Sequence, residues 1–521
     1  MNREEIAFLD VREEAPHAEG HPLFAANLPL TRLELDAYSK LPCRDVPIVT
    51  FDNGESLAVR AAEVLLKLGY RNVASFEGGL DSWKAAGGEV FIDVNVPSKA
   101  FGELMESVCH TPSLSAEEVK AMIDAGSDMV VVDVRRPDEY QTMSIPTGIN
   151  VPGAEVVLRV PDVIPSPKTR VIVNCAGRTR SIIGTQSLLN AGLPNPVAAL
   201  RNGTIGWTLA KQQLEFGQSR TFPGTTEPTA RQATQQAHAV ADRAGVKRVD
   251  KNTLSFWMNE ENRTTYLFDV RSFAEYETGH LPECYPIPGG QLVQETEMYA
   301  PVRGSRIVLV DDDGVRANMT ASWLAQMAWD VYVVDGLTDD DFSQSGAWKP
   351  RLPELPDNQG ITPDTLHDWL QSGDVVVVDM AKHAAYRKGH ISSAWYVLRS
   401  RLDEAVHNLP KASRFVITSE DGQLAQFVAP ELAEHVKGQV YVLSGGTRDW
   451  AHGGYELEVG ETRLASMPID RYRRPYEGIN APPEAMQAYL DWEYGLIDQL
   501  ERDGTHHFQP MRFDMKACPD G

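Results

Sequence analysis

The chain has 521 residues, of which 42% are hydrophobic and 23% are charged. This composition is typical of folded globular domains and excludes a disordered chain, and the length favours roughly three to five domains over a single core. The 49 Lys and Arg residues against 73 Asp and Glu residues give a formal net charge of −24. That balance argues against nucleic acid as a partner, because nucleic-acid-binding proteins present basic faces.

Five cysteines occur at irregular spacings, and none forms a CxxC pair. An odd count without such pairs disfavours both a disulfide framework and a zinc site, and it suits a reducing compartment. The N-terminal stretch MNREEIAFLDVREE carries charges where a signal peptide needs an apolar core, and no run approaches the roughly 18 to 20 apolar residues of a membrane span. We therefore expect a soluble cytoplasmic protein without a membrane partner.

A repeat sets the organisation of the chain. Four apolar runs, in IAFLDVREE, MVVVDVRRPDEY, TYLFDVRSFAEY and VVVVDMAKHAAY, end at Asp10, Asp133, Asp269 and Asp379. A second apolar run ends 42 residues after each of the first three aspartates and 40 after the fourth, at Asp52, Cys175, Asp311 and Ser419. A helical pattern, a third apolar run and a glycine turn follow each time. Strands that alternate with helices in this way predict an α/β fold, with four small parallel sheets that carry helices on both faces.

In chain order the repeat predicts module 1 (residues 1–98), module 2 (99–222), module 3 (223–350, opened by a linker helix), module 4 (351–465) and a helical tail (466–521). Module 1 starts almost at its first strand, without the leading helix of modules 2 and 4. We therefore expect it to be incomplete or completed by another part of the chain. The tail sequence PPEAMQAYLDWEYGLIDQLERDG predicts a helix, begun by proline, that docks on a neighbouring domain.

Cys175 is the candidate reactive residue. It ends a strand, and functional sites of parallel sheets lie beyond the carboxyl ends of their strands. Loop amides and a helix N-terminus following it would stabilise a thiolate and lower the pKa of the thiol. The alternative is a buried cysteine that only packs, which is the more common role of a lone strand-end cysteine. The loop that would bind the substrate comprises Ala176, Gly177, Arg178, Thr179, Arg180 and Ser181.

This arrangement suits sulfur chemistry. A thiolate attacks the outer sulfur of a sulfane donor, and the persulfide that forms is an anion the same amides can hold. Arg178 and Arg180 would bind the anionic end of the donor through charge-assisted hydrogen bonds. The chemistry requires no metal, nucleotide or flavin, so no cofactor is expected.

The DVR, EY and GH motifs, the strand-ending cysteine loop and the glycine turn before Trp83, Trp207 and Trp450 resemble the rhodanese family, relatives of the thiosulfate sulfurtransferases. The resemblance implies that Cys175 carries a persulfide and passes its outer sulfur to cyanide or a thiol. It also implies that Arg180 corresponds to the arginine that the family has five residues after the cysteine. The chain departs from the family in having its loop glycine, Gly177, two rather than three positions after the cysteine.

The resemblance also implies that module 2 differs from the other three modules in catalytic activity. Asp52, Asp311 and Ser419 cannot form a persulfide, so modules 1, 3 and 4 are expected to be catalytically silent. An alternative function is therefore a persulfide carrier that delivers sulfur to a protein acceptor docked by these silent modules. A phosphatase is disfavoured, because the related phosphatases place arginine six residues after the cysteine, where this chain has Ser181.

Several further residues are weaker candidates. Arg135 recurs with its aspartate in silent modules, which favours a framework role, with the rim of the site as the alternative. Arg201 is equally suited to face the loop or solvent. Glu155 and Arg159 are candidates for lining the pocket, and Cys518 is a candidate for a sulfur relay. Hydrogen bonds in a turn are the expected role of His21, His280 and His390. The other cysteines, Cys43, Cys109 and Cys284, are expected only to pack.

Overall fold

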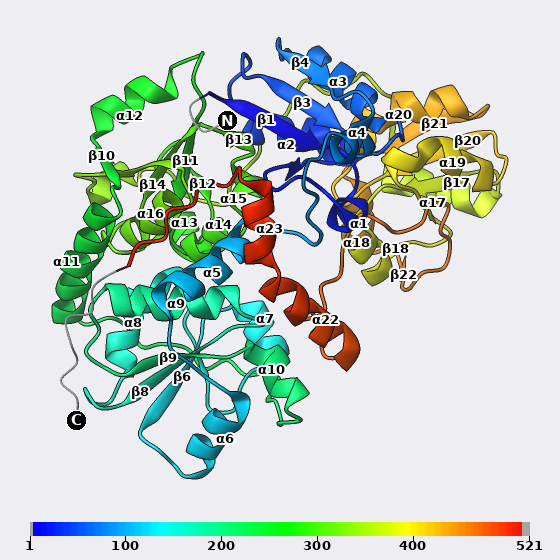
Figure 1. The fold of residues 1–521 in the computed structure, drawn as a ribbon. Helices are drawn as coiled ribbons and strands as arrows, with labels where there is room; N and C mark the ends of the chain where they lie inside the picture. Colours follow the sequence, from blue (N-terminus) through cyan, green and yellow to red (C-terminus); the bar gives the residue numbers. More distant parts are fainter. Residues whose placement is uncertain (1–3, 513–521) are drawn as a thin grey trace.

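The computed structural model describes residues 4–512 and contains four five-stranded sheets, one for each predicted module (Figure 1). The first strand of each repeat ends at the predicted aspartate. The second ends one residue before Asp52, Cys175, Asp311 or Ser419. The predicted α/β architecture and the register of its repeat are therefore confirmed.

Module 2 is built on a parallel sheet with the order β5-β9-β8-β6-β7. Val131 and Ile172 belong to a hydrophobic cluster on one face, and Val132 and Val173 to a second cluster on the other. Both faces are therefore covered, which explains the continuous apolar runs of the strands. Its elements are α5 (Val96–Cys109), β5 (Ser113–Leu114), α6 (Ala116–Asp124), β6 (Met129–Asp133), α7 (Pro137–Thr142), β7 (Ile149–Asn150), the 3₁₀ helix η2 (Gly153–Glu155), α8 (Val156–Val163), β8 (Arg170–Asn174), α9 (Thr179–Asn190), β9 (Val197–Leu200) and α10 (Gly203–Leu209).

Module 3 repeats this strand order as β10-β15-β14-β11-β12, and module 4 repeats it as β16-β21-β20-β17-β19 with a separate β18-β22 pair. The elements of module 3 are α11 (Glu227–Arg243), β10 (Lys247–Val249), α12 (Lys251–Met258), β11 (Thr265–Asp269), α13 (Phe273–Thr278), β12 (Tyr285–Pro286), α14 (Gly289–Gln294), α15 (Thr296–Tyr299), β13 (Val302–Arg303), β14 (Arg306–Val310), α16 (Arg316–Gln326), β15 (Asp330–Val334) and η3 (Asp339–Asp341). The elements of module 4 are β16 (Gly360–Ile361), α17 (Pro363–Ser372), β17 (Val376–Asp379), α18 (His383–Lys388), β18 (His390–Ile391), β19 (Trp395–Tyr396), η4 (Arg399–Arg401), α19 (Leu402–Ala405), η5 (Val406–Asn408), β20 (Arg414–Thr418), α20 (Gln423–His435), β21 (Gln439–Leu443), α21 (Gly446–His452) and β22 (Leu457–Glu458).

Module 1 is the incomplete copy, as predicted. Its sheet runs β4-β3-β1, with β2 beside β1, and within the described residues it has no counterpart of β5 and α6. Strand β13 of module 3 joins the β1 edge antiparallel, with Ile6 opposite Arg303 and Ala7 opposite Val302. Its elements are β1 (Ile6–Asp10), α1 (Glu14–Glu19), β2 (Ala26–Asn27), η1 (Leu30–Arg32), α2 (Leu33–Lys40), β3 (Ile48–Phe51), α3 (Leu57–Lys67), β4 (Val73–Ser75) and α4 (Gly79–Ala85).

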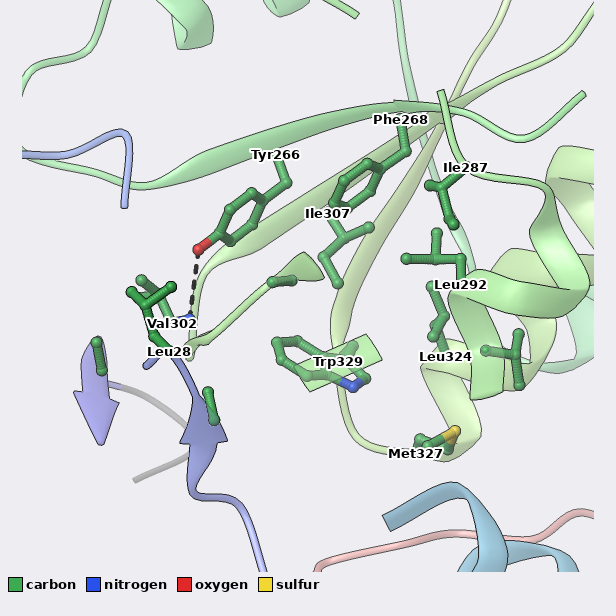
Figure 2. Close-up of a cluster of buried hydrophobic side chains, with 14 of the residues drawn as sticks. Leu28, Tyr266, Phe268, Ile287, Leu292, Val302, Ile307, Leu324, Met327 and Trp329 are labelled. Carbon is green, nitrogen blue, oxygen red and sulfur yellow. Dashed lines mark hydrogen bonds between the residues drawn. The ribbon is translucent and has the colours of Figure 1, made fainter. Parts of the chain in front are cut away.

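One hydrophobic cluster joins modules 1 and 3. Figure 2 shows Tyr266 and Phe268 of β11 beside the module 3 core, with Leu28 of module 1 close by. The Tyr266 hydroxyl accepts a hydrogen bond from the Val302 amide at 3.3 Å and donates one to the Lys40 carbonyl at 2.7 Å. The two modules therefore share a core and cannot move independently.

The modules also meet in pairs through equivalent segments. The 3₁₀ helix η1 packs on η4 between modules 1 and 4, and η2 packs on α14 between modules 2 and 3. The buried Arg399 in η4 crosses the first interface and donates to both carboxylate oxygens of Glu34.

The tail forms α22 (Pro483–Tyr494) and α23 (Leu496–Asp503), which lie between the modules (Figure 1). Helix α22 contacts α10 and α5, and α23 contacts α5. The predicted docking of the tail is confirmed. Across residues 4–512 no helix is both long and apolar enough to cross a membrane.

Candidate active site

The strand β8 and the helix α9 present the loop that starts at Cys175. The carbonyl of Cys175 accepts from the Thr204 amide at 3.0 Å, and the carbonyl of Ala176 accepts from the Ile205 amide at 3.0 Å. Gly203, at φ +53°, permits this contact, since a Cβ there would lie 2.3 Å from the Cys175 carbonyl oxygen. The start of α10 therefore fixes the loop from below.

The Cys175 sulfur is buried, and the residue is only 1% exposed. Its thiol donates to the Ser181 hydroxyl at 3.4 Å. Burial raises the pKa of the Cys175 thiol, whereas the charge of Arg180 and the hydroxyl and amide of Ser181 lower it. The prediction of a lowered pKa is therefore wrong for this closed form, because desolvation outweighs the stabilising groups.

Arg180 is held by a partner that the sequence reasoning missed. Its two terminal nitrogens donate to both carboxylate oxygens of Glu139, at 2.7 and 2.9 Å. Burial raises the pKa of Glu139, but the charge and hydrogen bonds of Arg180 outweigh it and lower that pKa to about 2. A signal for this pair exists in the sequence, because Glu275 stands at the equivalent position of module 3 and pairs with Arg316.

Arg178 is also fully engaged. Its guanidinium donates to Glu103 at 2.7 and 2.8 Å, to Glu106, and to the Tyr494 hydroxyl at 2.8 Å. It also lies over the Tyr494 ring, 4.1 Å from its centroid. Arg178 thus ties the loop to α5 and to the tail. No repeat or motif marks Glu103, Glu106 or Tyr494, so the sequence reasoning had no means of finding them.

The tail covers the loop. A buried cluster contains Ala176 and Ile205 of module 2 together with Tyr476, Met486, Tyr489 and Leu490 of the tail. A Cβ built on Gly177 would lie 3.2 Å from Oε2 of Glu493 and 3.3 Å from Cε1 of Tyr489. The tail therefore covers the loop that follows Cys175.

The weaker candidates lie outside this loop. Arg135 is buried, donates to Asp133 at 2.9 and 2.7 Å and to the Met143 carbonyl at 2.6 Å, and so acts in the framework. Arg201 is exposed and donates to Ser113. Glu155 accepts from Arg159 at 3.0 Å and from Arg316 at 3.1 Å, at the interface with module 3.

The predicted turn histidines are buried and bind backbone carbonyls. His280 contacts the Tyr276 carbonyl and His390 the Tyr386 carbonyl, each at 2.8 Å, and His21 contacts the Asp93 carbonyl at 2.9 Å. Their structural role is confirmed. The proposed relay cysteine, Cys518, lies outside the described residues. No group of three or more His, Cys, Asp or Glu side chains within 4–512 could hold a metal ion.

Modules 1, 3 and 4 hold an oxygen-bearing side chain where module 2 holds the sulfur of Cys175. The side chains of Asp52, Asp311 and Ser419 each accept from the amide six residues later, at 2.9, 2.8 and 3.4 Å. The equivalent loop position therefore carries an oxygen in these three modules, and a thiol in module 2. In module 3, Asp313 also accepts a hydrogen bond from the Arg316 side chain at 2.7 Å. The loop arginine of module 3 is thus paired with a carboxylate of its own loop.

Comparisons with known proteins agree with this geometry. The model of the rhodanese-like domain matches residues 1–86, 115–210, 252–337 and 362–452. A crystal structure of thiosulfate sulfurtransferase from Pseudomonas aeruginosa is 60% identical, with a TM-score of 0.96, and the match covers 97% of this chain and 96% of that chain. The structure of the Alr3790 protein from Anabaena sp. is 29% identical, with a TM-score of 0.17, over 17% of this chain and 70% of that chain.

An uncharacterized 16.5 kDa protein of Synechococcus elongatus is 44% identical over 46 residues, or 9% of this chain. The match spans only 31% of that curated relative. The four family matches together cover well over half of the chain, and each contains most of the strands of one of the four sheets. The chain therefore belongs to the rhodanese-like domain family, as a tandem of four such domains.

Proposed function

We propose that the chain is a sulfurtransferase that moves sulfane sulfur from thiosulfate or a similar anionic donor to cyanide or a thiol through a persulfide on Cys175. One observation carries this proposal. Of the four equivalent loop positions, one holds a thiol, and the same loop has an arginine five residues later. The rhodanese domains and the similarity to a thiosulfate sulfurtransferase support it.

The loading step follows from the chemistry of the loop. The Cys175 thiolate attacks the outer sulfur of the donor, a new S–S bond forms, and the donor's S–S bond breaks with its electron pair on the leaving group. With thiosulfate the leaving group is sulfite, so total charge is conserved. The charge of Arg180 and the hydroxyl and amide of Ser181 lower the pKa of the thiol and so favour the thiolate.

The second step returns the enzyme to its starting form. Cyanide or an acceptor thiolate attacks the outer sulfur of the persulfide, and the electron pair of the broken S–S bond returns to Cys175. We propose that Arg178 and Arg180 take part in anion binding, although both guanidiniums face carboxylates in this closed form. Donor binding would then require partial release of these contacts.

The experiment is an intact-mass measurement after incubation with thiosulfate. The wild type is expected to gain the mass of one sulfur, and Cys175→Ser is expected to gain none. Sulfur uptake by Cys175→Ser, or sulfite release that this variant retains, would show that another group carries the sulfur.

A second candidate function is a carrier that delivers the persulfide to a docked protein. A cleft of about 1020 Å³ favours it, because modules 1, 3 and 4 and the tail line this cleft and no residue of 99–222 does. Charge reversal of Arg32 and Lys382, both on the cleft wall, should then leave transfer to cyanide unchanged and impair only transfer to the protein acceptor. Equal loss of both reactions would count against a docking role.

A further inference from the structure

The tail brings one acidic side chain into the covered site. Glu493 of α22 is 1% exposed. Its Oε1 accepts a hydrogen bond from the Tyr489 hydroxyl at 2.9 Å, whereas its Oε2 has no hydrogen-bond partner within the described residues. Leaving a buried polar atom without a partner is unfavourable, because the atom loses its hydrogen bonds to water and gains none. Such an atom at a site that must bind an anion indicates a place for a ligand.

The unpartnered oxygen lies against the loop of Cys175. An ideal Cβ on Gly177 would approach Oε2 of Glu493 to 3.2 Å, so the carboxyl group sits directly over the backbone two residues after the cysteine. The ring of Tyr489 also lies over Gly177, with Cε1 at 3.3 Å from the same point, and its hydroxyl holds the carboxyl group through Oε1. Gly177 is not among the residues with positive φ, so its glycine is needed for this close approach and not for a left-handed turn.

The surroundings favour the neutral form of the acid. Burial is the largest influence and raises the pKa of Glu493, and the nearby charge of Glu103 on α5 raises it further. The charge of Lys99 on α5, the hydroxyl of Tyr489 and the charge of Arg178 on the loop act in the opposite direction, and the resulting pKa is about 8. The carboxyl group therefore keeps its proton at neutral pH. With Oε1 accepting from Tyr489, the proton resides on Oε2, where it can be donated.

We propose that Glu493 is a substrate-binding residue of the Cys175 site, and that its protonated carboxyl donates a hydrogen bond from Oε2 to the anionic group of a sulfur donor above the loop. This inference rests on the proposed sulfurtransferase function. A neutral donor group suits the site, because Glu103, Glu106 and Glu139 already neutralise both loop arginines. An ionised Glu493 would instead repel the donor and, by its charge, raise the pKa of Cys175.

No proton has to be transferred in this role. The thiolate of Cys175 forms the new S–S bond, the donor's S–S bond breaks, and the leaving group departs with the electron pair. Glu493 retains its proton and stabilises the negative charge on the bound donor and leaving group. The role requires only a hydrogen-bond donor at the position of Oε2. The amide group of glutamine can therefore replace the protonated carboxyl group, and it donates at any pH because it does not ionise.

The test compares Glu493→Gln with the wild type, and Glu484→Gln on the exposed face of the same helix is the matched control. The rate at which Cys175 gains one sulfur from thiosulfate is measured by intact mass at about pH 7 and about pH 9. A group with a pKa of about 8 is roughly nine-tenths protonated at the first pH and one-tenth at the second. The ratio of the E493Q rate to the wild-type rate should therefore rise about tenfold between them.

Taking the ratio removes the part of the Cys175 pH dependence that the two proteins share. The charge of ionised Glu493, which raises the pKa of Cys175, acts on the wild type alone and changes the ratio in the same direction. The E484Q ratio should stay constant. A ratio for E493Q that is the same at both pH values overturns the inference while leaving the sulfurtransferase function intact. Absence of any sulfur gain by the wild type overturns the proposed function and this inference with it.

A spectroscopic measurement tests the same point without relying on turnover. The infrared spectrum of the wild type near neutral pH should contain the band of a protonated carboxylic acid that E493Q lacks and E484Q retains. The band should fade as the pH rises through about 8. An E493Q spectrum with the same acid bands as the wild type would overturn the assigned protonation state and the proposed role.

Discussion

Replacement of Arg180 by glutamine tests two effects of this residue, one on the stability of module 2 and one on the rate at which Cys175 would gain sulfur. In the wild type the Arg180 contact outweighs burial and lowers the pKa of Glu139 from its usual 4.5 to about 2. This shift corresponds to about 3 kcal/mol, at about 1.4 kcal/mol for each pKa unit. R180Q leaves the Glu139 carboxylate buried without its cation, so module 2 should lose about 3 kcal/mol of stability at neutral pH.

The pH dependence of this loss follows from the direction of the shift. Because the folded pKa of Glu139 is depressed, its stabilisation is complete above about pH 4.5 and disappears as the pH falls towards 2. The difference between wild type and R180Q should therefore shrink over that range. Hydrogen exchange of the β8 and α9 amides reports the free energy of opening this module alone.

The loading rate provides the second measurement, with Arg316→Gln as the control in module 3. Arg180 is the charge that most favours the Cys175 thiolate, and each unit by which the thiol pKa rises removes about nine-tenths of the thiolate at neutral pH. R180Q should load sulfur about tenfold or more slowly. R316Q breaks the equivalent pair with Glu275, so it should weaken module 3 without slowing loading. Equal loading by R180Q and wild type, or equal slowing by R316Q, would refute the reasoning.

Three further outcomes follow from the contacts. Gly177→Ala should push α22 from the loop and cost about 1 to 3 kcal/mol, visible as faster hydrogen exchange in α22, and unchanged exchange would contradict the close approach. Asp379→Asn should stabilise module 4 by up to about 4 kcal/mol, because burial raises the pKa of the Asp379 carboxyl from 3.8 to about 7. Between these two pH values the folded chain must keep a proton that the unfolded chain releases, so the gain, followed by hydrogen exchange of β17 and β20, should grow from about pH 4 to pH 7 and then level off. Arg399→Met should cost about 3 to 5 kcal/mol at the interface of modules 1 and 4 and leave the Cys175 loading rate unchanged.

The sequence predicts the four modules well because each repeats the same physical requirement. A parallel sheet covered on both faces needs apolar strands at fixed spacing, and the aspartate that ends each first strand binds the amide two residues later in every module. The buried Asp and Arg pair recurs in modules 1, 2 and 3, so its framework role is visible from the repeat alone. Periodic features of this kind need no knowledge of how the modules pack.

The covered site could not be predicted, because its parts come from segments outside the repeat. Glu103 and Glu106 lie on α5, which precedes the first strand of the module 2 repeat, and Glu493 lies in the tail, 318 positions after Cys175. Only the packing of α5 and α22 on the loop brings them together. This packing also explains why the expected lowering of the thiol pKa is reversed, since the sequence reasoning assumed a loop open to water.

The position of the loop glycine connects these observations. In modules 3 and 4 the third residue after the nucleophile position is Gly314 or Gly422, with φ of +67° and +82°. In module 2 that residue is Arg178, at φ −120°, and no residue of its loop is left-handed. The backbone therefore no longer needs glycine at the third position, which frees it for an arginine that binds α5 and the tail. Glycine is needed instead at Gly177, where Glu493 approaches. The displaced glycine, the arginine and the tail carboxyl are thus parts of one arrangement, and a change in any of them should be felt by the other two.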